Sequence, residues 1–190
     1  MSFDETIIHC SAPALCGIKP ASLFSMNSEC YDTGRGKLSE WRGVFAKSGR
    51  YLVPLRKSDA MVLFFVFDKI LLDGVLGDAR TESYLKEKGY PVGRGSGAVL
   101  AELLHRLAFQ ESFPHEVGVF LGYPLGDVIA FERGEENCKL AGLWKVYGGE
   151  KEAKRKMALY KSCTEFCAEL IRSGVSVPAS VQKFTGTQGK

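Results

Sequence analysis

The sequence predicts a single-domain α+β protein in which several helices pack on a small, mainly antiparallel sheet. Strand-like stretches at about 51–67 predict a hairpin, and an alternating stretch at about 138–147 predicts a further strand. Apolar residues at spacings of three and four predict a long C-terminal helix over about 150–172. The length of 190 residues suits one domain. We expect that domain to span 1–174 and the tail at 175–190 to be frayed.

The first third of the chain carries mixed local signals. Residues 3–10 fit either a short helix or an entry strand. The apolar run at 14–24 is broken by a glycine and a proline, which predicts a bent or edge strand. Residues 26–36 have the composition of a loop, and the apolar spacing over 37–47 predicts a helix.

The hairpin is the firmest local pattern in the sequence. Its two strands, 51–55 and 60–67, are separated by a short polar connection. Pro54 has no backbone N–H to donate to a ladder, so the first strand is expected at the edge of the sheet. The second strand is apolar on both faces, which predicts a central position.

Between the hairpin and the last helix, the sequence predicts a series of helices. Residues 69–88 form one helical stretch interrupted by glycines. The glycine-rich segment 93–97 lacks the residues of a phosphate-binding loop, so we interpret it as a connector before a helix over about 98–110. Residues 113–121 fit a helix, with a strand as the open alternative, and a short helix follows over 124–131.

Composition narrows the classes of function. The chain has 25 basic and 22 acidic residues, a net charge of +3 that does not indicate a nucleic-acid or membrane partner. The N-terminus has no signal-peptide pattern, and the longest apolar run is too short to cross a bilayer, so a cytoplasmic protein is expected. The six cysteines should then be mostly reduced, and their spacing matches no structural zinc site, so no metal site is expected.

Three blocks of sequence, taken in order, resemble a bacterial family. The first block runs from His9 to Phe24, the second reads FPHEVGVFLGYP over 113–124, and the third reads GLWKVYG over 142–148. Together they resemble the family known as domain of unknown function 3793, over about residues 5 to 170. The resemblance implies a cytosolic bacterial protein with a connection to redox or iron metabolism, and it implies no particular reaction.

Three residues are candidates for catalysis. His115 beside Glu116 can serve general acid–base chemistry. Helix neighbours point about 100° apart, however, so the alternative is that Glu116 only complements the helix dipole. Cys10 can act as a nucleophile if its pKa is lowered, and the alternative is a buried free cysteine.

A second set of residues is expected to bind a ligand. Lys19, Arg56 and Lys145 lie on predicted strands or at their ends, and they would form a cationic rim if they converge. Tyr123 and Trp144 add aromatic surface, although the alternation around Trp144 also predicts core packing.

Cys163 and Cys167 lie one turn apart on the predicted last helix, a spacing that can clamp a metal ion. The same apolar stripe contains Met157, Tyr160 and Leu170, so we interpret the two cysteines as core residues.

The sequence therefore favours a binding or accessory protein whose partner is a small molecule or another protein, and it contains no complete motif that would identify a cofactor. One alternative is a small enzyme that uses His115 and Glu116, with Cys10, on an anionic small molecule. A third hypothesis is a DNA-binding helix-turn-helix around residues 122–124, but the second helix offers little basic charge to a groove.

Overall fold

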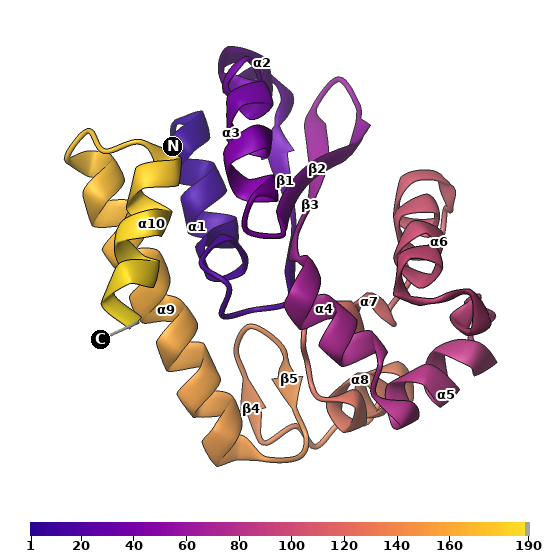
Figure 1. The fold of residues 1–190 in the computed structure, drawn as a ribbon. Helices are drawn as coiled ribbons and strands as arrows, with labels where there is room; N and C mark the ends of the chain where they lie inside the picture. The colour runs from indigo at the N-terminus through magenta and orange to yellow at the C-terminus, as the bar shows by residue number, and fades with distance from the viewer. Residues whose placement is uncertain (189–190) are drawn as a thin grey trace. The chain divides into compact units, whose positions relative to one another are not determined.

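The predicted α+β class is confirmed by a computed structural model, which describes residues 1–188. Over those residues, an antiparallel sheet in the order β1-β3-β2 and a small β4-β5 sheet are accompanied by helices (Figure 1). The strands are Ala21–Asn27 (β1), Arg50–Lys57 (β2), Met61–Asp68 (β3), Leu140–Ala141 (β4) and Lys145–Val146 (β5). The helices are Phe3–Leu15 (α1), Ser28–Gly34 (α2), Lys37–Ala46 (α3), Lys69–Leu76 (α4), Ala79–Glu87 (α5), the 3₁₀ turn Val92–Arg94 (η1), Ser96–Phe109 (α6), Val117–Phe120 (α7), Leu125–Glu132 (α8), Glu150–Arg172 (α9) and Val177–Gln188 (α10).

The described chain divides into two compact units. Unit 1 consists of Met1–Leu71 together with the chain from Ala158 onward, and unit 2 consists of Leu72–Met157. Each unit has an apolar cluster of its own: one around α1 and β3 in unit 1, and one around Trp144 in unit 2. The single-domain boundary at 1–174 stays a prediction.

The hairpin is confirmed at the centre of unit 1. β3 pairs antiparallel with both β1 and β2, so it takes the predicted central position. β2 lies at one edge, and the register shifts between Pro54 and Arg56, where the proline cannot continue the ladder. Phe64 and Val66 of β3 are fully buried in the core of unit 1.

The N-terminal segment differs from its predicted structure. The edge strand predicted within 14–24 is present as β1, but it spans Ala21–Asn27, because α1 runs to Leu15. The loop predicted at 26–36 is wrong, since α2 follows β1 directly. A capping box starts α1: the backbone N–H of Glu5 donates to Ser2 Oγ, and the backbone N–H of Ser2 donates to the Glu5 carboxylate. The helix then buries its apolar face in the sheet core, which outweighs the strand-like composition of its last residues.

The C-terminal segment is helical where a frayed tail was expected. α10 places Val177, Val181 and Phe184 in the apolar core of unit 1, with exposed fractions of 0%, 3% and 5%. The Phe184 ring packs edge-on against Phe166 of α9, with the ring centroids 5.7 Å apart. This buried apolar face holds the segment in place despite its polar composition.

The helices predicted between the hairpin and α9 are present, but they begin and end at other residues than predicted. The stretch 69–88 forms α4 and α5, because Asp78 caps α5 by accepting hydrogen bonds from the N–H groups of Arg80 and Thr81. The open choice at 113–121 is resolved as the short helix α7. The predicted single strand at 138–147 is wrong: a turn around Gly142 folds this stretch into the β4–β5 hairpin.

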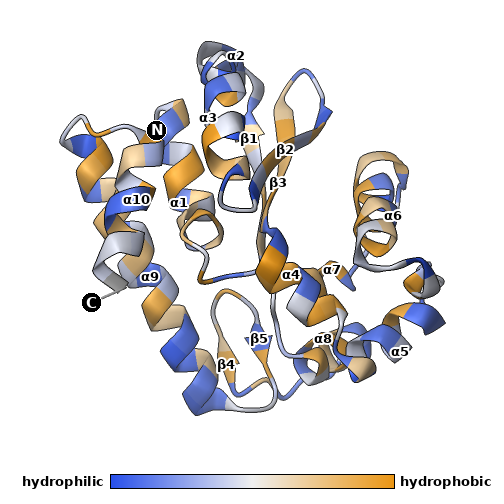
Figure 2. Cartoon of the chain, in the orientation of Figure 1, coloured by the Kyte–Doolittle hydropathy of each residue, from blue (hydrophilic) through white to orange (hydrophobic). Residues whose placement is uncertain are grey.

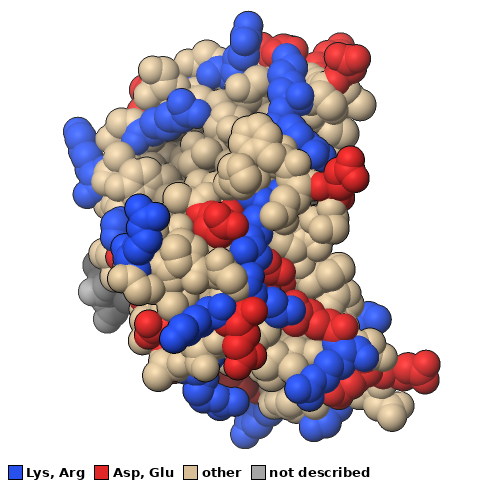
Figure 3. Space-filling view, turned by 90° about the vertical axis from the view of Figure 1, so that its right-hand side faces the viewer, with Lys and Arg blue, Asp and Glu red and all other residues tan. Residues whose placement is uncertain are grey.

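α9 is confirmed as a long helix. Figure 2 shows its first turns as hydrophilic, in agreement with the run of Lys, Arg and Glu between residues 150 and 156. On the face drawn in Figure 3, acidic and basic side chains are interspersed. None of the helices in residues 1–188 combines the length and apolar character needed to cross a membrane.

Candidate functional site

Three cysteines meet in the core of unit 1. Cys16 is the C-cap of α1, and Cys163 and Cys167 lie one turn apart on α9. Their Sγ atoms all lie within 4.8 Å of one another, and those of Cys16 and Cys167 are 3.8 Å apart. We call these residues the thiol cluster. Over residues 1–188 it is the one group of three or more His, Cys, Asp or Glu residues whose ligand atoms lie close enough together to hold a metal ion.

The fold positions the thiol cluster through the end of one helix and the apolar face of another. Gly17 adopts a φ of +72°, which ends α1 and leaves Cys16 at its C-terminus. The i, i+4 spacing places Cys163 and Cys167 on the same face of α9. All three side chains are buried, with exposed fractions of 4% for Cys16 and 0% for the other two.

The electrostatics of the thiol cluster favour one negative charge on Cys167. Hydrogen bonds from the thiols of Cys16 and Cys163 lower the pKa of Cys167 below the ordinary value of a thiol. The same contacts raise the pKa of Cys16, which keeps that thiol protonated. A thiolate with two further sulfurs beside it is a ligand set that soft metal ions prefer.

Lys19 lies three residues after Cys16 and is itself buried, with 8% of its surface exposed. Burial lowers the pKa of its ammonium group to about 8. The Nζ atom lies 5.9 Å from the ring centroid of Tyr160 on α9. By contrast, Arg56 is exposed on β2, and Lys145 belongs to unit 2. The structure therefore does not place the three cations of the predicted rim in one unit.

Glu116 is engaged in a buried network of unit 2. Its Oε1 accepts a hydrogen bond from Tyr90 Oη at 2.9 Å and one from Arg106 Nη1 at 3.0 Å. Arg106 also donates to Glu102 at 2.7 Å, and its guanidinium lies 4.0 Å from the ring centroid of Tyr90. Burial and the neighbouring carboxylate raise the pKa of Tyr90, so it remains a donor to Glu116. This network fixes α6 to the segment before α7.

His115 and Cys10 do not join Glu116. The His115 side chain is exposed and lies edge-on to the rings of Phe113 and Phe131, with centroid distances of 5.8 and 5.5 Å. Cys10 belongs to unit 1, where partial burial raises the pKa of its thiol and so disfavours the nucleophilic thiolate. Of the three candidates for catalysis, Cys10 thus belongs to unit 1, whereas His115 and Glu116 belong to unit 2.

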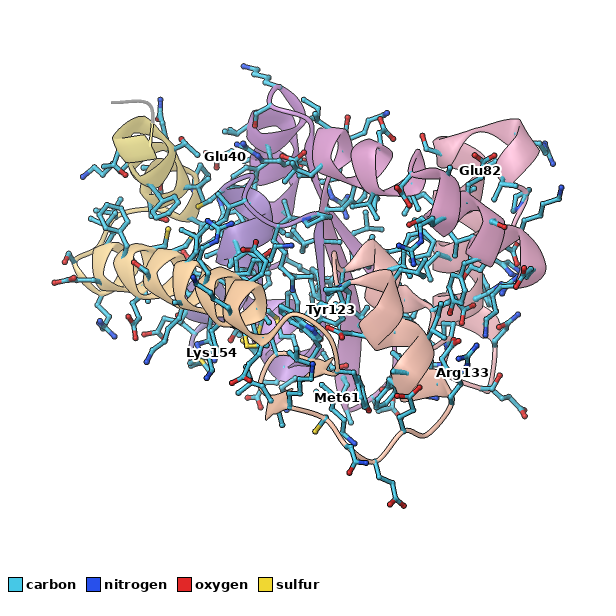
Figure 4. All side chains as sticks on the ribbon, turned by 90° about the horizontal axis from the view of Figure 1, so that it is seen from below. Glu40, Met61, Glu82, Tyr123, Arg133 and Lys154 are labelled. Carbon is cyan, nitrogen blue, oxygen red and sulfur yellow. The ribbon has the colours of Figure 1, made fainter. Side chains whose placement is uncertain are left out.

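Sequence reasoning missed Asp127, which binds the third sequence block, 142–148, through three hydrogen bonds. Trp144 Nε1 donates to one carboxylate oxygen of Asp127 at 2.9 Å. The other oxygen accepts hydrogen bonds from the backbone N–H groups of Tyr147 and Gly148, each at 2.9 Å. Tyr123, labelled in Figure 4, stacks on Trp144 with ring centroids 4.9 Å apart. The rings of Tyr123 and Trp144 therefore pack against each other. Trp144 is a buried core residue, as the alternation of the sequence around it predicts.

Lys145 keeps an exposed position beside this core. Its Nζ atom lies 5.6 Å from the ring centroid of Phe131, the same ring that His115 contacts edge-on. These exposed side chains give unit 2 a mixed aromatic and cationic surface around α8.

The sequence contained only part of the signal for the thiol cluster. The spacing of Cys163 and Cys167 suits a metal clamp, but the third sulfur is contributed by Cys16, which lies 151 positions before Cys167. No local pattern connects residues so far apart, whereas the fold brings them into contact.

The chain was also compared with known proteins. The family described as "Protein of unknown function (DUF3793)" matches residues 7–180, which includes all three sequence blocks and all three residues of the thiol cluster. No curated protein and no solved structure matches the chain. Because the match covers most of its length, this chain belongs to the family described as protein of unknown function, DUF3793.

Proposed function

We propose that this chain is a binding or accessory protein that holds one soft metal ion through the thiol cluster. The observation that carries the proposal is the convergence of three buried sulfurs within 4.8 Å. Thiolate ligands select soft or borderline ions such as Cu(I), Zn(II) and iron. Metal binding of this kind agrees with the connection to redox or iron metabolism that the resemblance to the family implies.

The arrangement of the ligands supports a bound ion. Two sulfurs come from one face of α9 and the third from the end of α1, so an ion bound here would cross-link two helices of unit 1. The lowered pKa of Cys167 means that, of the three thiols, this one loses its proton most readily when a metal ion binds. A reducing compartment such as the cytoplasm would keep all three sulfurs available, and we propose that location for the protein.

A catalytic role has less support from the geometry. Glu116 is occupied by Tyr90 and Arg106, and the Cys10 thiol is held in its neutral form. The proposal therefore assigns the chain a binding role, with the metal ion as its small ligand.

The test is a metal titration of the full chain, reduced and kept under anaerobic conditions. Co(II) is the first probe, because thiolate ligation gives it a charge-transfer absorption in the near ultraviolet; Fe(II) and Zn(II) follow by competition. We expect binding of one ion per chain, with loss of the absorption in C163S. The control is C30S, which removes a cysteine of unit 1 outside the thiol cluster.

Equal binding by C163S and C30S would contradict the proposal, since the ion would then lie elsewhere. Failure of the wild-type chain to bind any of these ions, or Cu(I), would overturn it. Circular dichroism of each variant shows whether a lost absorption reflects lost ligation or lost folding.

A further inference from the structure

We infer that the ion for which the thiol cluster is built is monovalent copper, Cu(I), held by sulfur alone. The inference rests on the proposed function and specifies the ligand of the same site. It follows from the number of donors, their spacing and their surroundings.

The donor count favours Cu(I) over Zn(II). Within the described residues, the three sulfurs have no histidine or carboxylate ligand atom close enough to complete the group. Structural zinc is almost always four-coordinate, so zinc would need a fourth ligand from outside this set. Cu(I) is soft, and two or three thiolates satisfy it.

The spacing of the sulfurs fits a single ion. With a metal–sulfur distance of about 2.3 Å, three sulfurs in a plane around an ion are about 4.0 Å apart, and two on opposite sides are about 4.6 Å apart. The observed separations, 3.8 Å for Cys16 to Cys167 and at most 4.8 Å for the other pairs, match these values. In an iron–sulfur cluster, by contrast, several irons and sulfides lie between the cysteines, which requires a wider opening.

The surroundings of the thiol cluster are mostly apolar and buried. The cluster is part of the apolar core that also contains Leu15, Val177 and Val181. On the α10 side, Ser180 is fully buried, and its carbonyl oxygen lies 3.9 Å from Cys167 Sγ. A divalent ion that keeps a water ligand would have to bring that water into this core, at a cost that Cu(I) avoids.

The experiment is a competition between the anaerobic, reduced full chain and the Cu(I) chelator bicinchoninate, paired with a Zn(II) competition against a zinc indicator. We expect one Cu(I) per chain, with an affinity that falls in C167S by more than the roughly 10–100-fold that loss of an outer ligand partner costs. C30S should retain wild-type affinity. X-ray absorption of the copper-loaded chain should show sulfur as the sole type of ligand.

Each other outcome counts against the inference in a distinct way. Retention of Zn(II) or Fe(II) by the thiol cluster without retention of Cu(I) would overturn the choice of copper and leave the proposed function intact. If C167S and C30S weaken copper binding equally, copper binds to cysteines in general and not specifically to the thiol cluster. That result would overturn the proposed site. If C167S fails to fold, C163A takes its place, because alanine suits the interior of α9 and also removes a sulfur.

Discussion

Asp127 of α8 holds the chain around β5 through a single buried carboxylate. Its exposed fraction is 4%, and it accepts one hydrogen bond from the Trp144 indole and two from backbone N–H groups. A buried donor that loses its acceptor keeps the full cost of its desolvation. The contacts of this one residue therefore determine the position of the chain that follows β5.

We expect D127A to lower the free energy of unfolding by about 3 kcal/mol, because it leaves three donors without an acceptor. The measurement is urea denaturation followed by circular dichroism. E136A is the matched control, since Glu136 is an exposed carboxylate of the same unit. A change in D127A no larger than that in E136A would show that water replaces the carboxylate.

Lys19 makes stability depend on pH in the alkaline range. Its pKa is about 8 in the folded chain, against an ordinary value of 10.5. Between these two pH values the unfolded chain binds the additional proton, so the free energy of unfolding rises with pH. Below pH 8 the lysine is protonated in both states, and the cost of burying its charge is fully present.

We therefore expect the stability of the wild-type chain relative to K19M to increase by roughly 3 kcal/mol between pH 8 and 10.5. Taking the difference removes the titration of the cysteines, which both proteins share. The control is K47M, which removes an exposed lysine of the same unit. A difference that stays constant over this range would refute the lowered pKa.

At the scale of the element, α10 covers the thiol cluster. Val177, Val181 and Phe184 are buried in the same core as the three cysteines. α10 is the last element of the described chain, and its apolar side chains pack into the core of unit 1. This packing holds α10 over the cysteines. Loosening α10 should therefore expose the sulfurs without removing any of them.

F184A tests this role of α10. Truncation of a buried phenylalanine costs about 3–5 kcal/mol, and we expect a faster reaction of Cys163 and Cys167 with an alkylating reagent, followed by peptide mass spectrometry. K183A, at an exposed neighbouring position on α10, should react at the wild-type rate. Unchanged labelling of both cysteines in F184A would mean that other elements protect them.

For the whole molecule, the division into two units predicts a local response to metal. All three sulfurs belong to unit 1. An ion that binds only the folded site stabilises the segments that supply its ligands. We expect hydrogen exchange of the metal-loaded chain to slow in α1, in α9 after Ala158 and in α10, whereas exchange within residues 72–157 stays the same. Equal slowing across both units would show that the site acts on the entire chain.

Some elements of this fold follow directly from local sequence patterns. The hairpin of β2 and β3, the helix α3 and the long helix α9 are all present as predicted. In each case the apolar period and the polar or glycine-rich flanks agree with one another. The capping box at Ser2 and Glu5 was an available signal for α1, and the strand-like residues near Leu15 obscured it.

Other elements depend on partners that are distant in the sequence. α10 is a helix because unit 1 buries its apolar face, and polar composition alone predicted a frayed tail. The alternation at 138–147 describes the faces of the chain correctly, but it does not reveal the turn at Gly142 or the hydrogen bonds to Asp127. Local periodicity contains no information about such contacts.

The sequence by itself determined the α+β class, the central hairpin and the long α9, because each of these rests on spacing along the chain. It also determined the family, because the resemblance lies in the sequence blocks themselves. Only the tertiary structure decided which candidate residues belong together. Cys10 belongs to unit 1 and His115 to unit 2. Glu116 accepts a hydrogen bond from Arg106, and Cys16 lies beside the two cysteines of α9. The physical reason is that a site consists of contacts across the fold, and contacts between residues 151 positions apart arise only when helices pack.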